Sequence, residues 1–282
     1  MDNRVLRIDV ASVVRERLPG AARFVPGFLL NGLARLIHQE ELNALLESNA
    51  GREGADFCRG VLDDLGVTYN IIGGENMPAA ADRRVVYVSN HPLGALDGIA
   101  LIDMVTRHHG MEPRFVVNDL LMAVKPLRRV FVPINKHGGQ THAATSELQR
   151  AFEADAPVIV FPAGLVSRKR KGGEIHDLEW RKMVVNKAVE HGRDIIPLYF
   201  GGCNSPFFYN FAKLRTLTGL KFNVEMALLP GEIFKCRGAC FPIVAGRRVK
   251  ASTLAGGREA RREVQALCDA VYSLRASLPD DK

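Results

Sequence analysis

Residues 85–98, VVYVSNHPLGALDG, decide the fold that the sequence predicts. The stretch opens with four apolar residues in succession, and VIVF at residues 158–161 is a second run of the same kind. Continuous apolar strands are typical of a parallel sheet that helices cover on both faces, whereas half-exposed strands alternate apolar and polar residues. Each run then breaks into a turn that contains Pro and Gly. The two stretches therefore predict an α/β protein.

The chain beyond residue 84 alternates short β-rich runs with longer amphipathic runs. Besides strands at residues 85–88 and 158–161, we expect strands at residues 114–117, 130–134, 195–200, 223–228 and 241–244. Helices are expected near residues 98–109, 140–153, 178–191 and 256–277. The expected architecture is a mixed, largely parallel sheet that helices cover on both faces.

The first part of the chain differs from the rest, because its apolar residues recur every three or four positions. We therefore expect an N-terminal helical region over residues 1–75 and an α/β domain over residues 76–282. Residues 24–37 are the most apolar stretch of the first region, and they fall far short of the ~20 apolar residues that span a bilayer.

The composition is that of an ordinary globular protein of 282 residues, 47% hydrophobic and 24% charged. It excludes a disordered chain, a coiled coil and a collagen-like repeat. The five cysteines are odd in number and mostly far apart, which indicates a reducing compartment. The first twenty residues place acids and arginines where a signal peptide needs an apolar core, so we expect a cytoplasmic protein.

The charge balance raises a rival class of protein. With 38 Lys and Arg against 31 Asp and Glu, the formal net charge is +7 and the pI is near 9.3. A basic nucleic-acid-binding protein is a remote alternative, because zinc-finger spacing and an aromatic RNA-binding signature are both missing, so we expect no nucleic-acid partner. A serine hydrolase is disfavoured because the sequence has no Gly-x-Ser-x-Gly motif. Cys236 and Cys240 have no second close pair or His cluster beside them, so no metal site is expected.

His91 and Asp97 follow the first apolar run, at a strand end where α/β sheets commonly form a ligand crevice. Six residues of continuous helix would turn by about 600° and place the two side chains on different faces. They can meet only if His91 lies in the loop, which Pro92 and Gly94 favour, and Asp97 lies on the first helical turn. An Asp beside a His fixes its tautomer and makes the other ring nitrogen a competent general base. The alternative is that His91 bonds a carbonyl group and Asp97 caps the helix.

The second apolar run leads into residues 161–173, FPAGLVSRKRKGG, which combine a Pro/Gly turn with four consecutive cations. Such a run of charge is usually a solvated face without a ligand. Directly after a core strand, it favours a crevice for an anionic group such as a phosphate, a carboxylate or the diphosphate of coenzyme A.

Four blocks, taken in chain order, resemble the glycerolipid acyltransferases typified by lysophosphatidic acid acyltransferase. Residues 90–98 resemble the family's His/Asp catalytic block, and Lys125 with residues 132–136 resembles its acceptor-side block. Residues 161–168 resemble the block that contacts the acceptor head group, and residues 196–198 resemble the strand that lines the acyl site. The ordered set is far more specific than any one block.

Two departures from the family pattern bear on the acceptor. Five residues separate His91 from Asp97 where the family has four, and Ala163 and Val166 stand where the family has a Glu and an Arg. In these respects the sequence is similar to a bacterial branch labelled hemolysin-like, and residues 37–43 fit that branch too. Members of the branch are implicated in O-acylation of N-acyl amino acid lipids, so the head group of the acceptor stays open.

The resemblance implies a phospholipid or glycerolipid acyltransferase that moves a fatty acyl group from an acyl carrier protein or coenzyme A thioester to a lipid hydroxyl, such as that of lysophosphatidic acid. The alternative acceptor is an N-acyl amino acid lipid of the ornithine or glycine type. No cofactor is implied, with His91 as general base, Asp97 orienting it and backbone amides near Gly94 or Gly164 holding the oxyanion. The expected donor- and acceptor-binding residues are Asn90, Gly94, Lys125, Asn135, Lys136, Pro162, Gly164, Ser167, Arg168 and Lys169.

An acceptor of this kind lies in a membrane. An acyl tail of about 14 methylenes, at ~0.8 kcal/mol each, is held in a bilayer by roughly 11 kcal/mol. The sequence therefore predicts a peripheral enzyme on the inner face of the cell membrane, attracted by its positive charge to an anionic lipid surface. The amphipathic stretch at residues 18–37 is the expected contact, with a core helix as the alternative.

Overall fold

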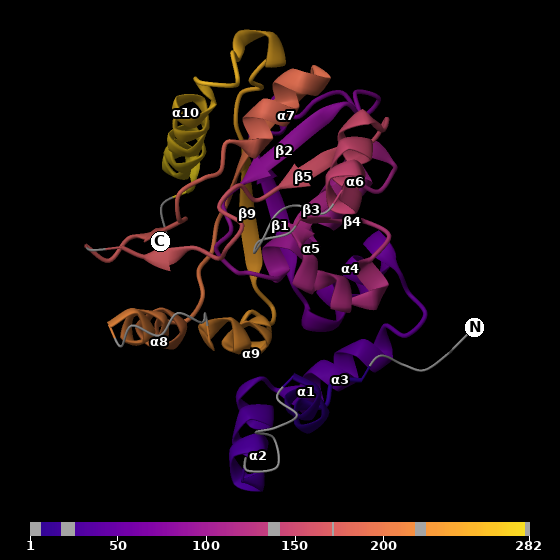
Figure 1. Ribbon diagram of the computed structural model, residues 1–282, viewed down its shortest axis with the longest axis vertical. Coiled ribbons are helices and arrows are strands. Elements are labelled where there is room, and N and C mark those ends of the chain that lie inside the picture. The colour runs from indigo at the N-terminus through magenta and orange to yellow at the C-terminus, as the bar shows by residue number, and fades with distance from the viewer. Residues whose placement is uncertain (1–6, 18–25, 135–141, 171, 218–223, 280–282) are drawn as a thin grey trace.

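Seven strands form one sheet in the order β1-β9-β8-β2-β5-β3-β4 in the computed structural model (Figure 1). All neighbours pair in parallel except β8 and β9, so the predicted mixed, largely parallel sheet is confirmed. The strands are β1 (Thr68–Ile72), β2 (Val85–Ser89), β3 (Arg114–Asn118), β4 (Phe131–Ile134), β5 (Val158–Val160), β8 (Asp194–Phe200) and β9 (Cys240–Ala245). The structure describes residues 7–17, 26–134, 142–170, 172–217 and 224–279.

Helices cover both faces of this sheet, because successive residues of each strand point to opposite sides. Val85 and Tyr87 of β2 belong to the core that α4 and α5 cover, whereas Val86 and Val88 belong to the core that α6, α7 and α10 cover. All four side chains are fully buried, which explains why residues 85–88 form a continuous apolar run. The helices are α4 (Gly54–Leu65), α5 (Leu96–His109), α6 (His142–Glu153), α7 (Met183–His191) and α10 (Ala260–Ser273).

The strand expected at residues 223–228 is wrong. Val224–Leu228 is a 3-10 helix, η5, which leads into the helix α9 (Leu229–Lys235), and Asn223 lies outside the described residues. The side chains of Leu228 and Leu229 are both buried in one cluster with Phe208. Successive residues of a strand point to opposite faces and could not pack in this way.

Two other elements differ from the expected pattern. The strand β1 lies in the region expected to be helical, and it pairs in parallel with β9 at the edge of the sheet. The helix expected from residue 178 begins at Met183. The residues before it are held in an irregular path, because Trp180 donates its indole N–H to Asp177 and the N–H of Arg181 bonds to the carbonyl of Pro162.

The N-terminal region is otherwise helical, as expected. The helices α1 (Val10–Arg17), α2 (Gly27–Leu36) and α3 (Gln39–Ser48) lie below the sheet in the view of Figure 1. None of the residues of α2 is buried, so the core-helix alternative is wrong for this part of the amphipathic stretch, whose residues 18–25 lie outside the described residues. The helix α4 and the strand β1 contribute to the main core although they precede residue 76, and the division of the chain at residue 75 stays a prediction.

Two insertions complete the fold around the central strands. A short antiparallel hairpin, β6 (Arg168–Lys169) and β7 (Ile175–His176), follows β5, and α8 (Pro206–Leu217) with α9 follows β8. The remaining 3-10 turns are η2 (Gly74–Asn76), η3 (Asp119–Ala123), η4 (Lys125–Leu127), η6 (Ala251–Thr253) and η7 (Leu274–Ser277). No helix in the described part of the chain combines the length and the apolar character needed to cross a bilayer.

Candidate active site

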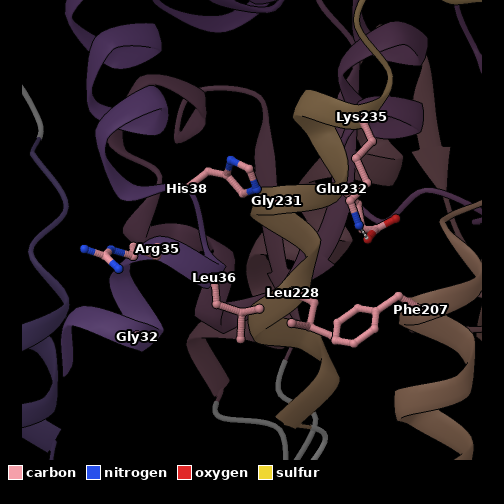
Figure 2. Close-up of a pocket in the computed structure, with 9 residues that line it drawn as sticks. All are labelled: Gly32, Arg35, Leu36, His38, Phe207, Leu228, Gly231, Glu232 and Lys235. Carbon is pink, nitrogen blue, oxygen red and sulfur yellow. Dashed lines mark hydrogen bonds and ion pairs between the residues drawn. The ribbon is translucent and has the colours of Figure 1, made fainter. Parts of the chain in front are cut away.

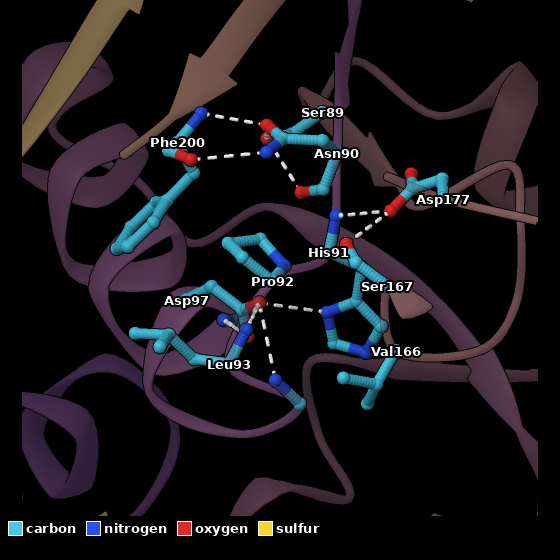
Figure 3. Close-up of polar contacts among 12 residues, drawn as sticks. Ser89, Asn90, His91, Pro92, Leu93, Asp97, Val166, Ser167, Asp177 and Phe200 are labelled. Atoms are coloured by element: carbon cyan, nitrogen blue, oxygen red, sulfur yellow. Dashed lines mark hydrogen bonds and ion pairs between the residues drawn. The ribbon is translucent and has the colours of Figure 1, made fainter. Parts of the chain in front are cut away.

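His91 and Asp97 meet at the carboxyl end of β2. His91 lies in the loop after the strand, and Asp97 lies on the first turn of α5. The Nδ1 atom of His91 is 2.9 Å from the Oδ2 atom of Asp97 (Figure 3). An ionised carboxylate only accepts hydrogen bonds, so Nδ1 carries the proton and Nε2 is the basic nitrogen. The placement expected for the two residues, loop for the His and first turn for the Asp, is confirmed.

The Asp97 carboxylate also organises the loop itself. Its Oδ2 atom accepts the backbone N–H groups of Leu93 at 2.9 Å and Gly94 at 3.2 Å, and its Oδ1 atom accepts the N–H of Gly98 at 2.8 Å. The carboxylate therefore satisfies N–H groups at the start of α5 while it holds His91. The pairing of Asp97 with His91 and its capping role, which were alternatives in the sequence, occur together.

The electrostatic surroundings keep Asp97 ionised. Burial raises the pKa of its carboxyl, because no part of the side chain reaches solvent. The charge and hydrogen bond of His91, together with the loop N–H groups, outweigh burial and hold the pKa below its ordinary value. The imidazole of His91 keeps 15% of its surface exposed and stacks on Phe161, with ring centroids 4.1 Å apart. One flat side of the imidazole is thus packed against Phe161, and the ring is still accessible to solvent.

Gly94 occupies a position that other residues cannot take. Its φ is +85°, and a Cβ atom there would lie 2.6 Å from Val166 Cγ2 and 2.8 Å from Leu229 Cδ1. Its N–H is bonded to Asp97, and the N–H of Gly164 donates to the Phe161 carbonyl at 2.9 Å. Both amides are used within their loops, and the expectation that backbone amides near Gly94 or Gly164 hold an oxyanion stays a prediction.

Asn90 connects the ends of two strands beneath the His91 loop. Its side-chain oxygen accepts the N–H of Phe200 at 2.7 Å, and its side-chain nitrogen donates to the carbonyl of Phe200 at 3.0 Å (Figure 3). The side chain is buried. Asn90 therefore ties the end of β2 to the end of β8, and a direct contact with a ligand, which the sequence suggested, stays a prediction.

Residues that follow β5 form hydrogen bonds with the backbone of His91. The N–H of Ser167 donates to the His91 carbonyl at 2.8 Å, and the N–H of His91 donates to Asp177 Oδ1 at 3.2 Å. The hydroxyl of Ser167 donates to the same Asp177 oxygen at 2.5 Å, and Trp180 donates its indole N–H to Asp177 Oδ2 at 2.9 Å. Both polar groups of the His91 backbone are thus held by one buried assembly, which is visible in Figure 3.

Asp177 is the residue of this site that the sequence did not identify. In sequence it stands beside His176, and neighbouring residues of a regular element do not face each other. The structure agrees on that pair, because His176 bonds the backbone carbonyl of Asp177 and not its carboxylate. Besides the nearby Trp180, the carboxylate binds His91 and Ser167, which are 86 and 10 residues away and which no local pattern signals.

Arg168, expected to meet an anionic ligand, is held by a buried carboxylate of the protein. It donates to Glu225 Oε1 at 2.7 Å, and Arg215 contacts Glu225 Oε2 at 2.7 Å. Burial lowers the pKa of the Arg168 guanidinium, although Glu225 opposes this effect, and the side chain is 15% exposed. The guanidinium also lies 5.7 Å from the ring centroid of Phe208. Arg168 therefore joins the loop after β5 to η5 and α8.

The other predicted binding residues are spread around this centre. Pro162 is buried and accepts a backbone hydrogen bond through its carbonyl, whereas Gly164 and Lys169 are exposed on the loop after β5. Lys125 is exposed in η4. Asn135 and Lys136 lie outside the described residues. The structure thus joins His91, Asp97, Gly94 and Ser167 through direct contacts, and the ligand contacts of the whole set stay predictions.

Comparison with known proteins gives one consistent family. Residues 12–281 match the family described as Acyltransferase. Lyso-glycine lipid O-acyltransferase of Phocaeicola vulgatus is 37% identical over 273 residues, covering 97% of this chain and 97% of the relative. The protein of the same name from Bacteroides thetaiotaomicron is 36% identical over 273 residues, covering 97% and 99%. A crystal structure of the 1-acyl-sn-glycerophosphate (LPA) acyltransferase, PlsC, from Thermotoga maritima matches with a TM-score of 0.44 and 17% identity over 90% of this chain and 95% of that one.

A His that is hydrogen-bonded to a buried Asp, at the carboxyl ends of the strands of a covered sheet, is an arrangement suited to acid–base chemistry. The match over nearly the whole sequence shows that the chain belongs to the acyltransferase family. The expectation of an acyltransferase, drawn from four sequence blocks, is confirmed.

The ionised state of Asp97 can be tested through stability. An Asp97→Asn variant should be less stable than the wild type near neutral pH by roughly 1–3 kcal/mol, because it loses charge-assisted hydrogen bonds. The pKa of Asp97 is lowered in the folded protein, so the contribution is complete above its unfolded pKa of about 3.9 and is lost as the pH falls through the folded pKa. Urea unfolding of both proteins between about pH 7 and about pH 3 measures it. A stability difference that stays constant over this range would contradict the assignment.

The positioning role of Asp177 predicts a loss in kcat. An Asp177→Asn variant weakens the grip on the His91 backbone and should lower kcat by about tenfold to a hundredfold, with little change in KM. The matched control is Asp155→Asn, whose carboxylate is 70% exposed in an ion pair with Arg83 and should leave both constants unchanged. Steady-state kinetics measure kcat and KM of each variant, and thermal unfolding checks that each variant is folded. An unchanged kcat, or a change confined to KM, would show that Asp177 does not position the base.

Proposed function

We propose that this acyltransferase esterifies the hydroxyl of an N-acylated glycine lipid at a membrane surface, with an acyl thioester as donor and His91 as general base. The observation that carries the proposal is the 2.9 Å contact between His91 Nδ1 and the buried Asp97, which leaves Nε2 as the basic nitrogen of a partly exposed ring. The reaction needs no cofactor, because proton transfer and positioning are sufficient for acyl transfer from a thioester.

Two observations favour a glycine-type acceptor over lysophosphatidic acid. The relatives that match 97% of the chain at 36% and 37% identity are named lyso-glycine lipid O-acyltransferases. In addition, Ala163 and Val166 stand at the positions of the phosphate-directed Glu and Arg, and the neighbouring Arg168 is already paired with the buried Glu225. Glycine has no side-chain hydroxyl, so the oxygen that accepts the acyl group must be carried by the fatty chain of the acceptor.

The chemistry follows from the tautomer of His91. The acceptor oxygen attacks the thioester carbonyl carbon while Nε2 of His91 takes the hydroxyl proton, and Asp97 stabilises the imidazolium. Collapse of the tetrahedral intermediate breaks the carbon–sulfur bond, and the leaving thiolate receives the proton from His91. The products are the ester and a free thiol. A general-base step of this kind contributes about 10²–10⁴-fold to the rate.

The donor and the location belong to the same proposal. Acyl carrier protein and coenzyme A are both anionic thioester carriers, and the exposed Lys125 and Lys169 are the described cations that would meet either one. The acceptor places the enzyme on the cytoplasmic face of the cell membrane as a peripheral protein. The helix α2 supports this, because Phe28 and Leu29 are exposed to 72% and 52%.

The proposed role of His91 as general base predicts that its replacement causes a large and selective loss of activity. Replacing His91 by Ala should lower acyl transfer by about 10²–10⁴-fold while the protein stays folded. The matched control is His108→Ala on α5, whose ring bonds the carbonyl of Pro78 and which should keep near-normal turnover. Product formation from an acyl thioester, followed by mass spectrometry, gives both rates. Near-normal turnover in the His91 variant would rule out the proposed base.

The acceptor class predicts a preference between two substrates. With either thioester donor, the enzyme should acylate an N-acylglycine that carries a hydroxyl on its fatty chain with a higher kcat/KM than lysophosphatidic acid. Chain lengths are matched so that partition into micelles does not decide the result. A higher kcat/KM for lysophosphatidic acid would overturn the acceptor and leave the role of His91 standing.

A further inference from the structure

Exposed apolar side chains gather on two helices. Within the described part of the chain, nine large apolar side chains are exposed, and three of these, Ile71, Leu121 and Leu178, lie elsewhere on the surface. The other six are Phe28, Leu29 and Leu36 on α2 and Phe207, Leu214 and Leu217 on α8, with exposures from 43% to 75%. Scattered apolar residues are normal on a protein surface, but a concentrated group marks an interaction site.

The helix α8 has two apolar faces. At 100° per residue, Phe207, Leu214 and Leu217 lie within an arc of about 80°. The buried Phe208 and Tyr209 lie on the opposite side and pack into a core cluster. A surface helix of a soluble protein normally turns a polar face to water. The outer face of α8 therefore carries three large apolar side chains, with only the exposed Asn210 between them, where a face that only meets solvent is normally polar.

The two helices border one pocket and so form a continuous surface, which we call the α2–α8 face. The pocket has a volume of about 370 Å³, and α9 forms its middle wall. Figure 2 shows three apolar side chains in a row across the pocket: Leu36 of α2, Leu228 of η5 and Phe207 of α8. In Figure 1, α8 and α9 lie side by side below the sheet, and α2 lies lower still.

Basic side chains beside the apolar ones indicate what kind of partner this face binds. Arg35 lines the pocket beside Leu36, the exposed Lys213 stands next to Leu214 on α8, and the ring of His38 in the same pocket is bonded to Glu41. The one acid in the pocket, Glu232, is already paired with Lys235 at 2.6 Å. Apolar side chains bordered by cations, on a chain of net charge +7, are complementary to an anionic lipid bilayer.

We infer that the α2–α8 face docks on an anionic bilayer, with α8 as a second contact besides α2. The inference rests on the proposed function in that the acceptor is a membrane lipid. The helix α9 links the face to the chemistry, because its Gly231 lines the pocket while its Leu229 lies against Gly94 of the catalytic loop. A bilayer on this face is therefore about one helix diameter, ~10 Å, from the loop that carries His91.

Vesicle flotation tests the contribution of α8. The wild type should float with vesicles of phosphatidylcholine and phosphatidylglycerol, and a Leu214→Asp/Leu217→Asp variant should bind them at least tenfold more weakly. Leu178→Asp, a substitution of another exposed leucine away from this face, should bind like the wild type. An Arg35→Glu/Lys213→Glu variant should lose binding to the anionic vesicles. Undiminished flotation of the Leu214/Leu217 variant would overturn the inference.

Two further measurements distinguish a failure of this inference from a failure of the proposed acceptor and from dimer formation. Acyl transfer to a short-chain, water-soluble N-acylglycine that carries a hydroxyl on its acyl chain should be unchanged in the Leu214/Leu217 variant, which also shows that the variant is folded. Failure of the wild type with every N-acylglycine would reject the proposed acceptor and leave the flotation result valid. Light scattering tests whether the face instead binds a second copy of the chain. A wild-type dimer that the Asp substitutions dissociate, without a change in flotation, would reject the bilayer as partner.

Discussion

The site depends on one buried carboxylate, that of Asp97. A single oxygen atom, Oδ2, accepts hydrogen bonds from the ring of His91 and from two N–H groups of the loop between them. Burying a carboxylate is unfavourable unless its oxygens are paired, and all these partners come from the seven residues that begin at His91. The loop must therefore adopt its native path for the charge to be tolerated. The same path places the basic nitrogen of His91 at the end of the sheet.

The parts of the site that come from distant segments hold this loop from outside. Asp177 and Ser167 bind the backbone of His91, and Asn90 binds Phe200 across to the neighbouring strand. These contacts place the loops after three parallel strands against one another. In a parallel sheet the carboxyl ends of the strands lie at one edge, which is why residues so far apart in sequence can share a site.

The positions of His91 and Asp97 could be predicted from the sequence, whereas the contacts made by residues from distant segments could not. The apolar run before Ser89, together with helix geometry, was enough to place His91 in a loop and Asp97 on a helical turn. Asp177 lies 86 residues from His91, and no spacing rule connects them. In the same way the four cations after β5 suggested an anion site, but one of them, Arg168, is bonded within the protein to Glu225, 57 residues further along the chain. Periodicity also failed at η5, because two adjacent buried leucines suit a helical turn as well as a buried strand.

The tautomer of His91 tests the central claim most directly. Long-range ¹H–¹⁵N spectra of uniformly labelled protein, with the His91 signals assigned by their loss in a His91→Ala sample, report which ring nitrogen carries the proton when the imidazole is neutral. The account predicts a protonated Nδ1 and an unprotonated Nε2, because Asp97 can only accept. A neutral ring with the proton on Nε2 would contradict it, since that ring could not accept a proton from an acyl acceptor.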